Sequence, residues 1–112
     1  MSKVWFITGC STGFGRELAK EVLQAGYKAV VTARNTNDIQ DIVSAYPTTA
    51  IAVRLDVTKE SDIQLAVETA LQKFNQIDVL VNNAGIGYFG AIEESDPAEV
   101  RRMFDINFFG LA

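Results

Sequence analysis

The sequence predicts an α/β fold, in which helices cover both faces of a doubly wound parallel sheet. Short runs rich in β-branched and aromatic residues alternate with longer segments of helical spacing. The short runs are continuously apolar, as in strands that are buried on both faces. We expect strands at residues 4–8, 29–32, 51–55 and 79–81, joined by right-handed βαβ units in the order 3-2-1-4.

The clearest helical segment lies before the fourth strand. Its apolar residues recur at i, i+3 and i+4 and form one stripe: Ile63, Ala66, Val67, Ala70, Leu71 and Phe74. We expect Thr58 to cap the N-terminus of this helix, because a Thr hydroxyl can accept a hydrogen bond from a free N–H of the first turn.

A last helix is predicted from Asp96, which is a suitable N-cap, with Pro97 at the first helical position and Glu99 in the place of a capping box. Residues 100–111 are apolar nearly all round, so this helix needs cover on two sides. The sheet supplies one side, and we expect a second subunit or chain to supply the other. Asn107 is the polar exception on the apolar stripe, and a buried amide needs a partner or a polar site.

Composition sets limits on the class of protein. The chain has 112 residues, 48% of them hydrophobic, and a net charge of −4, as in a small globular domain. It contains neither a run of the ~20 apolar residues that cross a bilayer nor a signal peptide, so we expect a cytoplasmic protein with no membrane partner. The ten basic residues form no stripe, which argues against nucleic acid. Without His, and with Cys10 alone, we expect no disulfide and no metal site.

A glycine-rich turn follows the first strand at residues 8–15, with the spacing G-x-x-x-G-x-G, and opens a helical segment. Glycines let the backbone approach a pyrophosphate, which the N–H groups and the dipole of the helix N-terminus attract. The plainer interpretation is a turn whose glycines supply a positive φ. The setting between a buried strand and a helix favours dinucleotide binding, as in a Rossmann fold. The predicted cofactor contacts are Gly9, Ser11, Thr12, Gly13, Phe14 and Gly15.

The end of the second strand indicates which dinucleotide binds. An acidic residue about 20 positions beyond the glycines usually binds the ribose 2′-OH of NAD. Here the strand ends Thr32-Ala33-Arg34-Asn35, so the forked donor of Arg34 replaces the carboxylate. The alternatives are that Arg34 is a solvated surface charge or stacks on adenine. We predict NADP rather than NAD.

Two further strand ends carry polar residues. Asp56 closes the third strand, at the edge of the sheet where ligands gather, although it could simply assist the turn into the next helix. The fourth strand ends Asn82-Asn83-Ala84-Gly85, and Asn is a poor strand residue. We expect these Asn side chains to tie neighbouring strands together where backbone pairing ends, and Gly85 to permit close backbone approach.

These motifs together resemble the N-terminal half of a classical short-chain dehydrogenase/reductase. The resemblance rests on the glycine turn, Asp56-Val57-Thr58, Asn82-Asn83-Ala84-Gly85 and Asn107, in the expected order along the chain. It implies that Asp56 accepts from the adenine amino group, Val57 gives a backbone contact, and Asn83, Ala84 and Gly85 line the cofactor crevice. The Ala33-Arg34 pair is similar to NADP-preferring members.

The resemblance also implies a catalytic Asn-Ser-Tyr-Lys set, in which Asn107 positions a water of the proton relay. None of the three tyrosines is followed by Lys four residues later, so residues 1–112 lack the catalytic Tyr and Lys. We therefore interpret residues 1–112 as a dinucleotide-binding Rossmann half-domain that continues beyond its C-terminus, within a single-domain enzyme.

The implied function is an NADP-dependent oxidoreductase that interconverts a small alcohol and a ketone or aldehyde by hydride transfer, as a homodimer or homotetramer. The alternative is a non-catalytic NAD(P)-binding module or redox sensor. A methyltransferase is disfavoured, because such sites usually also want a carboxylate where Arg34 stands.

Overall fold

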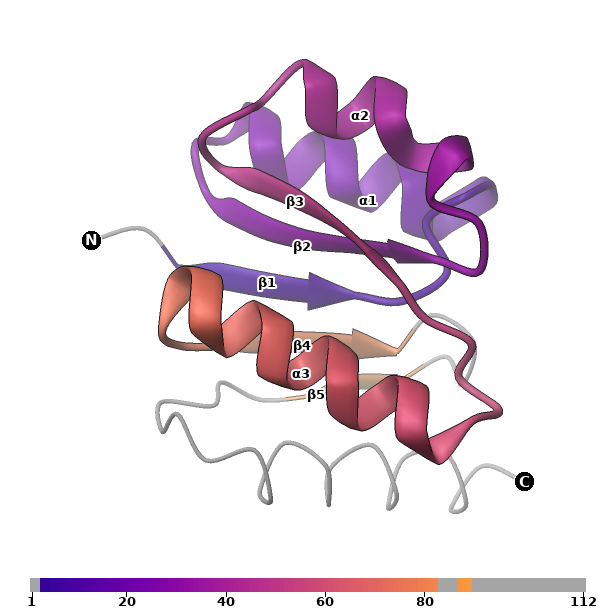
Figure 1. Cartoon of the computed structure of the whole chain (residues 1–112). Coiled ribbons are helices and arrows are strands. Elements are labelled where there is room, and N and C mark those ends of the chain that lie inside the picture. The colour runs from indigo at the N-terminus through magenta and orange to yellow at the C-terminus, as the bar shows by residue number, and fades with distance from the viewer. Residues whose placement is uncertain (1–2, 83–86, 90–112) are drawn as a thin grey trace.

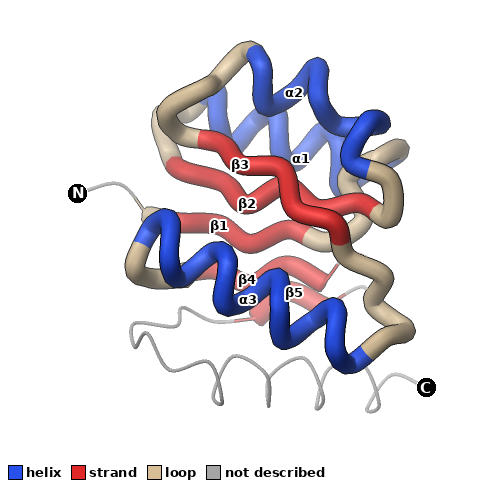
Figure 2. The backbone as a smooth tube through the Cα atoms, viewed as in Figure 1, coloured by secondary structure: helices blue, strands red, loops and turns tan. Residues whose placement is uncertain are grey.

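The fold was analysed in a computed structural model that describes residues 3–82 and 87–89. One sheet runs through it in the order β3-β2-β1-β4-β5 (Figures 1 and 2). The strands are β1 (Val4–Ile7), β2 (Lys28–Ala33), β3 (Ala50–Arg54), β4 (Val79–Asn82) and β5 (Gly87–Phe89). The first four are parallel and confirm the predicted order 3-2-1-4, whereas β5, which the sequence pattern did not predict, pairs antiparallel with β4.

Helices cover both faces of the sheet, as the doubly wound fold requires. Figure 1 shows α1 (Gly13–Gln24) and α2 (Gln40–Ser44) on one face and α3 (Glu60–Phe74) on the other. A short 3-10 helix, η1 (Thr36–Ile39), leads directly into α2. The second crossover is therefore built from two short pieces instead of one long helix.

The central strand β1 contributes to two separate hydrophobic clusters, because successive side chains point to opposite faces of a sheet. Phe6 packs with Leu80 and the apolar stripe of α3, while Ile7 packs with residues of α1 and α2. Phe6, Ile7 and Leu80 are fully buried. The predicted burial on both faces holds for β1, β2 and β4, but the middle of β3 is only half-buried because β3 lies at the edge of the sheet.

The prediction that Thr58 caps α3 was wrong. The helix begins at Glu60, and its N-cap is Lys59, whose side chain makes no capping hydrogen bond. The Thr58 hydroxyl instead donates to Asp56 Oδ1 at 2.6 Å. A carboxylate is a strong hydrogen-bond acceptor. The Thr58 hydroxyl therefore donates to Asp56, two residues earlier, and the Thr58 side chain turns back toward the strand.

The predicted last helix from Asp96, with Asn107 on its stripe, lies outside the described residues, as do Asn83, Ala84 and Gly85. No helix within residues 3–82 combines the length and the apolar character needed to cross a bilayer.

Replacing Leu80 with Ala tests the importance of the core around β4. Leu80 is fully buried, so we expect Leu80→Ala to lower the free energy of unfolding by about 2–5 kcal/mol. Leu65→Ala is the matched control, because Leu65 is 66% exposed on α3, and we expect a change below about 0.5 kcal/mol. Urea denaturation measures both, and equal losses would contradict this description of the core.

Candidate functional site

A cleft of about 390 Å³ lies beyond the carboxyl ends of β1, β2 and β3. Three loops that are far apart in the sequence line it: Gly9, Ser11, Thr12, Ala33, Arg34, Leu55, Asp56, Val57 and Thr58. In open α/β sheets, ligands bind outside the carboxyl ends of the strands, beside the strand where the order reverses. Here that strand is β1, which pairs with both β2 and β4.

The glycine turn forms one wall of the cleft. Gly9 and Gly13 both have φ of +65°, a conformation that side chains disfavour. Apart from its chain neighbours and its own helix, no atom of the described residues would lie within 4 Å of a Cβ built on Gly13, so space is left beside the backbone at the start of α1. The N-cap Thr12 makes no side-chain capping bond, and Gly15 is buried within the first turn of the helix. The free N–H groups of this turn provide donors for an anion.

Hydrogen bonds from the sheet hold the glycine turn in place. The Cys10 backbone N–H donates to the Thr32 carbonyl at 2.9 Å, and the Thr32 hydroxyl donates to the Ile7 carbonyl, also at 2.9 Å. The Cys10 thiol donates to the same Ile7 carbonyl at 3.3 Å. Cys10 is fully buried, and this burial raises the pKa of its thiol to about 12. The thiol is therefore a structural group that supports the turn from beneath.

A second set of bonds ties β1 to β4. The Thr8 backbone N–H donates to the Val81 carbonyl at 3.0 Å, and the Thr8 hydroxyl donates to Asn82 Oδ1 at 3.2 Å. Thr8 and Asn82 are both fully buried. The expectation that an Asn at the end of β4 links neighbouring strands is confirmed for Asn82.

Arg34 is the cation of the cleft. Its side chain is exposed, and it has no hydrogen bond or ion pair with any residue that the structure describes. Asp56 is the one carboxylate among the residues that line the cleft.

The nearby Arg16 differs from Arg34 because it is used within the protein. It donates to the Asp38 carbonyl at 3.1 Å and forms an ion pair with Asp41, thereby fastening α1 to the η1–α2 segment. The hydrogen bond from Arg16 lowers the pKa of the Asp41 carboxyl. The segment that follows Arg34 is therefore held against the helix of the glycine turn.

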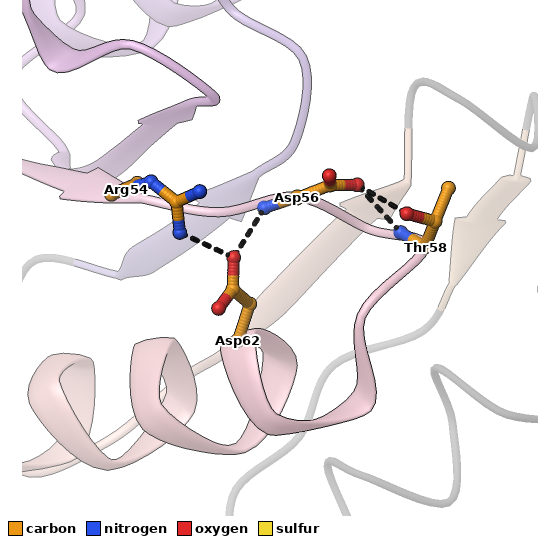
Figure 3. A network of polar contacts seen from close by, with 4 residues as sticks. All are labelled: Arg54, Asp56, Thr58 and Asp62. Carbon is orange, nitrogen blue, oxygen red and sulfur yellow. Dashed lines mark hydrogen bonds and ion pairs between the residues drawn. The ribbon is translucent and has the colours of Figure 1, made fainter.

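Asp56 takes part in the local turn and still faces the cleft. Its Oδ1 accepts hydrogen bonds from the Thr58 hydroxyl at 2.6 Å and from the Thr58 N–H at 3.0 Å (Figure 3). These two bonds hold the pKa of the Asp56 carboxyl below its ordinary value, and the bond from the hydroxyl has the larger effect. Oδ2 accepts no hydrogen bond from the described residues. One oxygen thus shapes the turn, and the other is available to a ligand.

The cleft unites six of the predicted site residues and leaves the others elsewhere. Gly9, Ser11, Thr12, Arg34, Asp56 and Val57 line it. Gly13, the first residue of α1, is not among the lining residues, and Phe14 is 65% exposed in the first turn of α1. The prediction did not include Ala33, Leu55 and Thr58, which also line the cleft. Each of the three is adjacent to a predicted residue in the sequence, so their position at the strand ends was the signal that would have identified them.

Comparisons with known proteins agree with this geometry. The sequence profile of the family described as short chain dehydrogenase matches residues 3–112. An oxidoreductase of Botryotinia fuckeliana is 34% identical over 112 residues, which are 99% of this chain and 41% of that protein. A short-chain dehydrogenase from Streptomyces avermitilis is similar in structure, with a TM-score of 0.71 and 43% identity over 74% of this chain and 31% of that one.

A second solved structure carries a cofactor. The 3-ketoacyl-(acyl-carrier-protein) reductase of Brucella melitensis, complexed with NADH, gives a TM-score of 0.66 at 38% identity and covers 70% of this chain and 32% of that one. The chain spans less than half the length of these relatives.

The burial of Cys10 predicts that its thiol reacts slowly. Because the thiolate is the reactive form and the raised pKa suppresses it, we expect alkylation by iodoacetamide at pH 8 to be at least about 100-fold slower in the native protein than in urea. Mass spectrometry of the peptide that contains Cys10 measures both rates. Native and denatured rates within twofold of each other would contradict the structural role of this thiol.

Proposed function

This chain belongs to the short-chain dehydrogenase family, and from that premise we propose that it is the cofactor-binding half of an NADP-dependent oxidoreductase. The proposed enzyme interconverts an alcohol and a ketone or aldehyde by hydride transfer. The observation that supports it best is the cleft, where the glycine turn, Arg34 and Asp56 come together from three loops.

The glycine turn is suited to the pyrophosphate of a dinucleotide. Gly9 and Gly13 give the turn its left-handed backbone, and the start of α1 adds N–H groups without intrahelical partners and the favourable end of a helix dipole. The hydroxyls of Ser11 and Thr12 lie at the same cleft as further donors. The space beside Gly13, which no protein atom fills, fits an approaching phosphate.

Arg34 favours NADP over NAD in this proposal. A guanidinium binds a phosphate with two parallel hydrogen bonds, and that of Arg34 forms no hydrogen bond or ion pair with the described residues. A carboxylate at this position would instead repel a 2′-phosphate and accept from a 2′-OH. The adenine end would then lie near Asp56 and the backbone of Val57, which line the cleft from the loop after β3.

The chemical step needs residues outside the described part of the chain. When bound, the nicotinamide ring supplies or accepts the hydride. We propose that Asn83, Ala84 and Gly85 line the crevice that holds this ring and that Asn107 positions a water for proton transfer, in line with the family resemblance. A Tyr and a Lys beyond residue 112 would complete the acid–base set, with the Lys cation lowering the pKa of the Tyr. The complete enzyme is proposed to be a cytoplasmic homo-oligomer that acts on a small alcohol or carbonyl substrate.

The preference for NADP is tested by Arg34→Asp in the full-length protein. Loss of the cation and gain of an anion should weaken NADPH binding roughly 100-fold and NADH binding less than about threefold. Isothermal titration with each cofactor measures the ratio. Lys73→Asp in the last turn of α3 gives the same change in net charge away from the cleft and should leave both affinities near wild type. An unchanged ratio in Arg34→Asp would disprove the 2′-phosphate role.

The position of the phosphates is tested by two Gly→Ala variants with the same backbone cost. Gly13 and Gly26 both have a positive φ, and a Cβ at either position meets no protein atom within 4 Å. We expect each variant to lose about 1 kcal/mol of stability. Only Gly13→Ala should also weaken NADPH binding, by at least about tenfold, because its Cβ projects where the phosphate would lie. Equal affinities for the two variants would place the phosphate elsewhere.

A further inference from the structure

Asp62 connects α3 to the loop that carries Asp56. It lies in the first turn of α3, and its Oδ2 accepts from Arg54 Nη1 at 2.7 Å and from the Asp56 backbone N–H at 3.1 Å (Figure 3). In a capping box, a carboxylate at this third helical position bonds back to the N–H of the N-cap residue. Here the carboxylate of Asp62 extends past the N-cap Lys59 and bonds the N–H of Asp56, six positions before Asp62.

The bond from Asp62 begins where strand pairing ends. The N–H of Leu55 still donates to the Ala33 carbonyl of β2 at 3.0 Å. The next N–H, that of Asp56, donates to Asp62. Because successive N–H groups of a strand point to opposite sides and β3 is an edge strand, the Asp56 N–H faces away from β2. Asp62 supplies its acceptor and fixes the main chain at the point where it leaves β3 for the cleft.

Asp56 is consequently held on two sides. Asp62 binds its backbone N–H, and Thr58 binds Oδ1 of its side chain. With both fixed, the carboxylate of Asp56, which lines the cleft, has a defined orientation. We propose that Asp62 is a positioning residue for the adenosine end of the cofactor, acting through the orientation of Asp56; this inference rests on the proposed function.

Arg54 explains why a carboxylate is suited to this position. A single Asp62 oxygen accepts from two donors, and one of them is the charged guanidinium of Arg54. Asn at position 62 would keep an oxygen for the Asp56 N–H but lose the attraction to Arg54. Ala would lose both. The expected order of adenosine affinity is therefore Asp, then Asn, then Ala.

The first measurement needs no cofactor. In the full-length protein, Asp62→Ala should speed the hydrogen exchange of the Asp56 amide at least about tenfold, measured by NMR, whereas Asp62→Asn should change it less than about threefold. Glu60→Ala removes the other first-turn carboxylate of α3 and is the control for the helix dipole. If exchange at Asp56 is unaffected by Asp62→Ala, the contact does not hold the loop and the inference fails.

The second measurement separates the two halves of the cofactor. By calorimetry, Asp62→Ala should raise the Kd of adenosine 2′,5′-bisphosphate about tenfold and leave that of reduced nicotinamide mononucleotide unchanged. Asp62→Asn and Arg54→Gln each keep an acceptor for the Asp56 N–H, so they should raise the Kd of the bisphosphate less than about threefold. Both variants should also disturb folding less than Asp62→Ala does. Glu60→Ala should leave both constants unchanged.

The outcomes distinguish this inference from the proposed function. An unchanged Kd for the bisphosphate in Asp62→Ala, or an equal loss for both halves, would overturn the positioning role while the proposed function stands. A wild-type protein that binds neither half would overturn the proposed function and, with it, this inference.

Discussion

The parallel pairing of β1 with both β2 and β4 is the constraint on which the site depends. Parallel pairing brings the carboxyl ends of these strands to one edge, and because the chain builds outward from β1 in both directions, α1 and α2 cover one face of the sheet and α3 covers the other. The loops after β1, β2 and β3 converge on one cleft because the strands that carry them end side by side. The bonds from Cys10 to β2 and from Thr8 to β4 keep the glycine turn in register with this edge.

Patterns that are local in the sequence were the ones that predicted the structure. Buried apolar runs gave the four parallel strands, and the glycine spacing located the turn, because both depend on a few consecutive residues. The half exposure of β3 was missed because its continuously apolar run was interpreted as burial on both faces, although the predicted order already places this strand at the edge. The Thr58 cap was predicted wrongly because the helix begins one residue later and the Thr58 hydroxyl donates to Asp56, a bond that only the folded turn reveals. The contact from Asp62 to Asp56 crosses the start of a helix that the pattern placed one residue too early.

Asp56 shows that a structural explanation and a functional one need not exclude each other. The sequence left open whether this residue assists a turn or contacts a ligand. The structure confirms the turn, through two bonds to a single oxygen, and the same bonds keep the carboxyl ionised and leave the second oxygen at the cleft. The turn thus prepares the carboxylate for a ligand, since a side chain that is already ordered loses less entropy on binding.

The alternation of side chains along β1 also has a consequence for cooperativity. Phe6 and Ile7 are adjacent in the chain but belong to different hydrophobic clusters. Neither cluster can open without exposing a strand that the other needs, so the two faces of the sheet should lose their structure together rather than as independent units. Any molecule that binds the cleft at the end of β1 then stabilises both faces at once, including α3 on the side opposite the glycine helix.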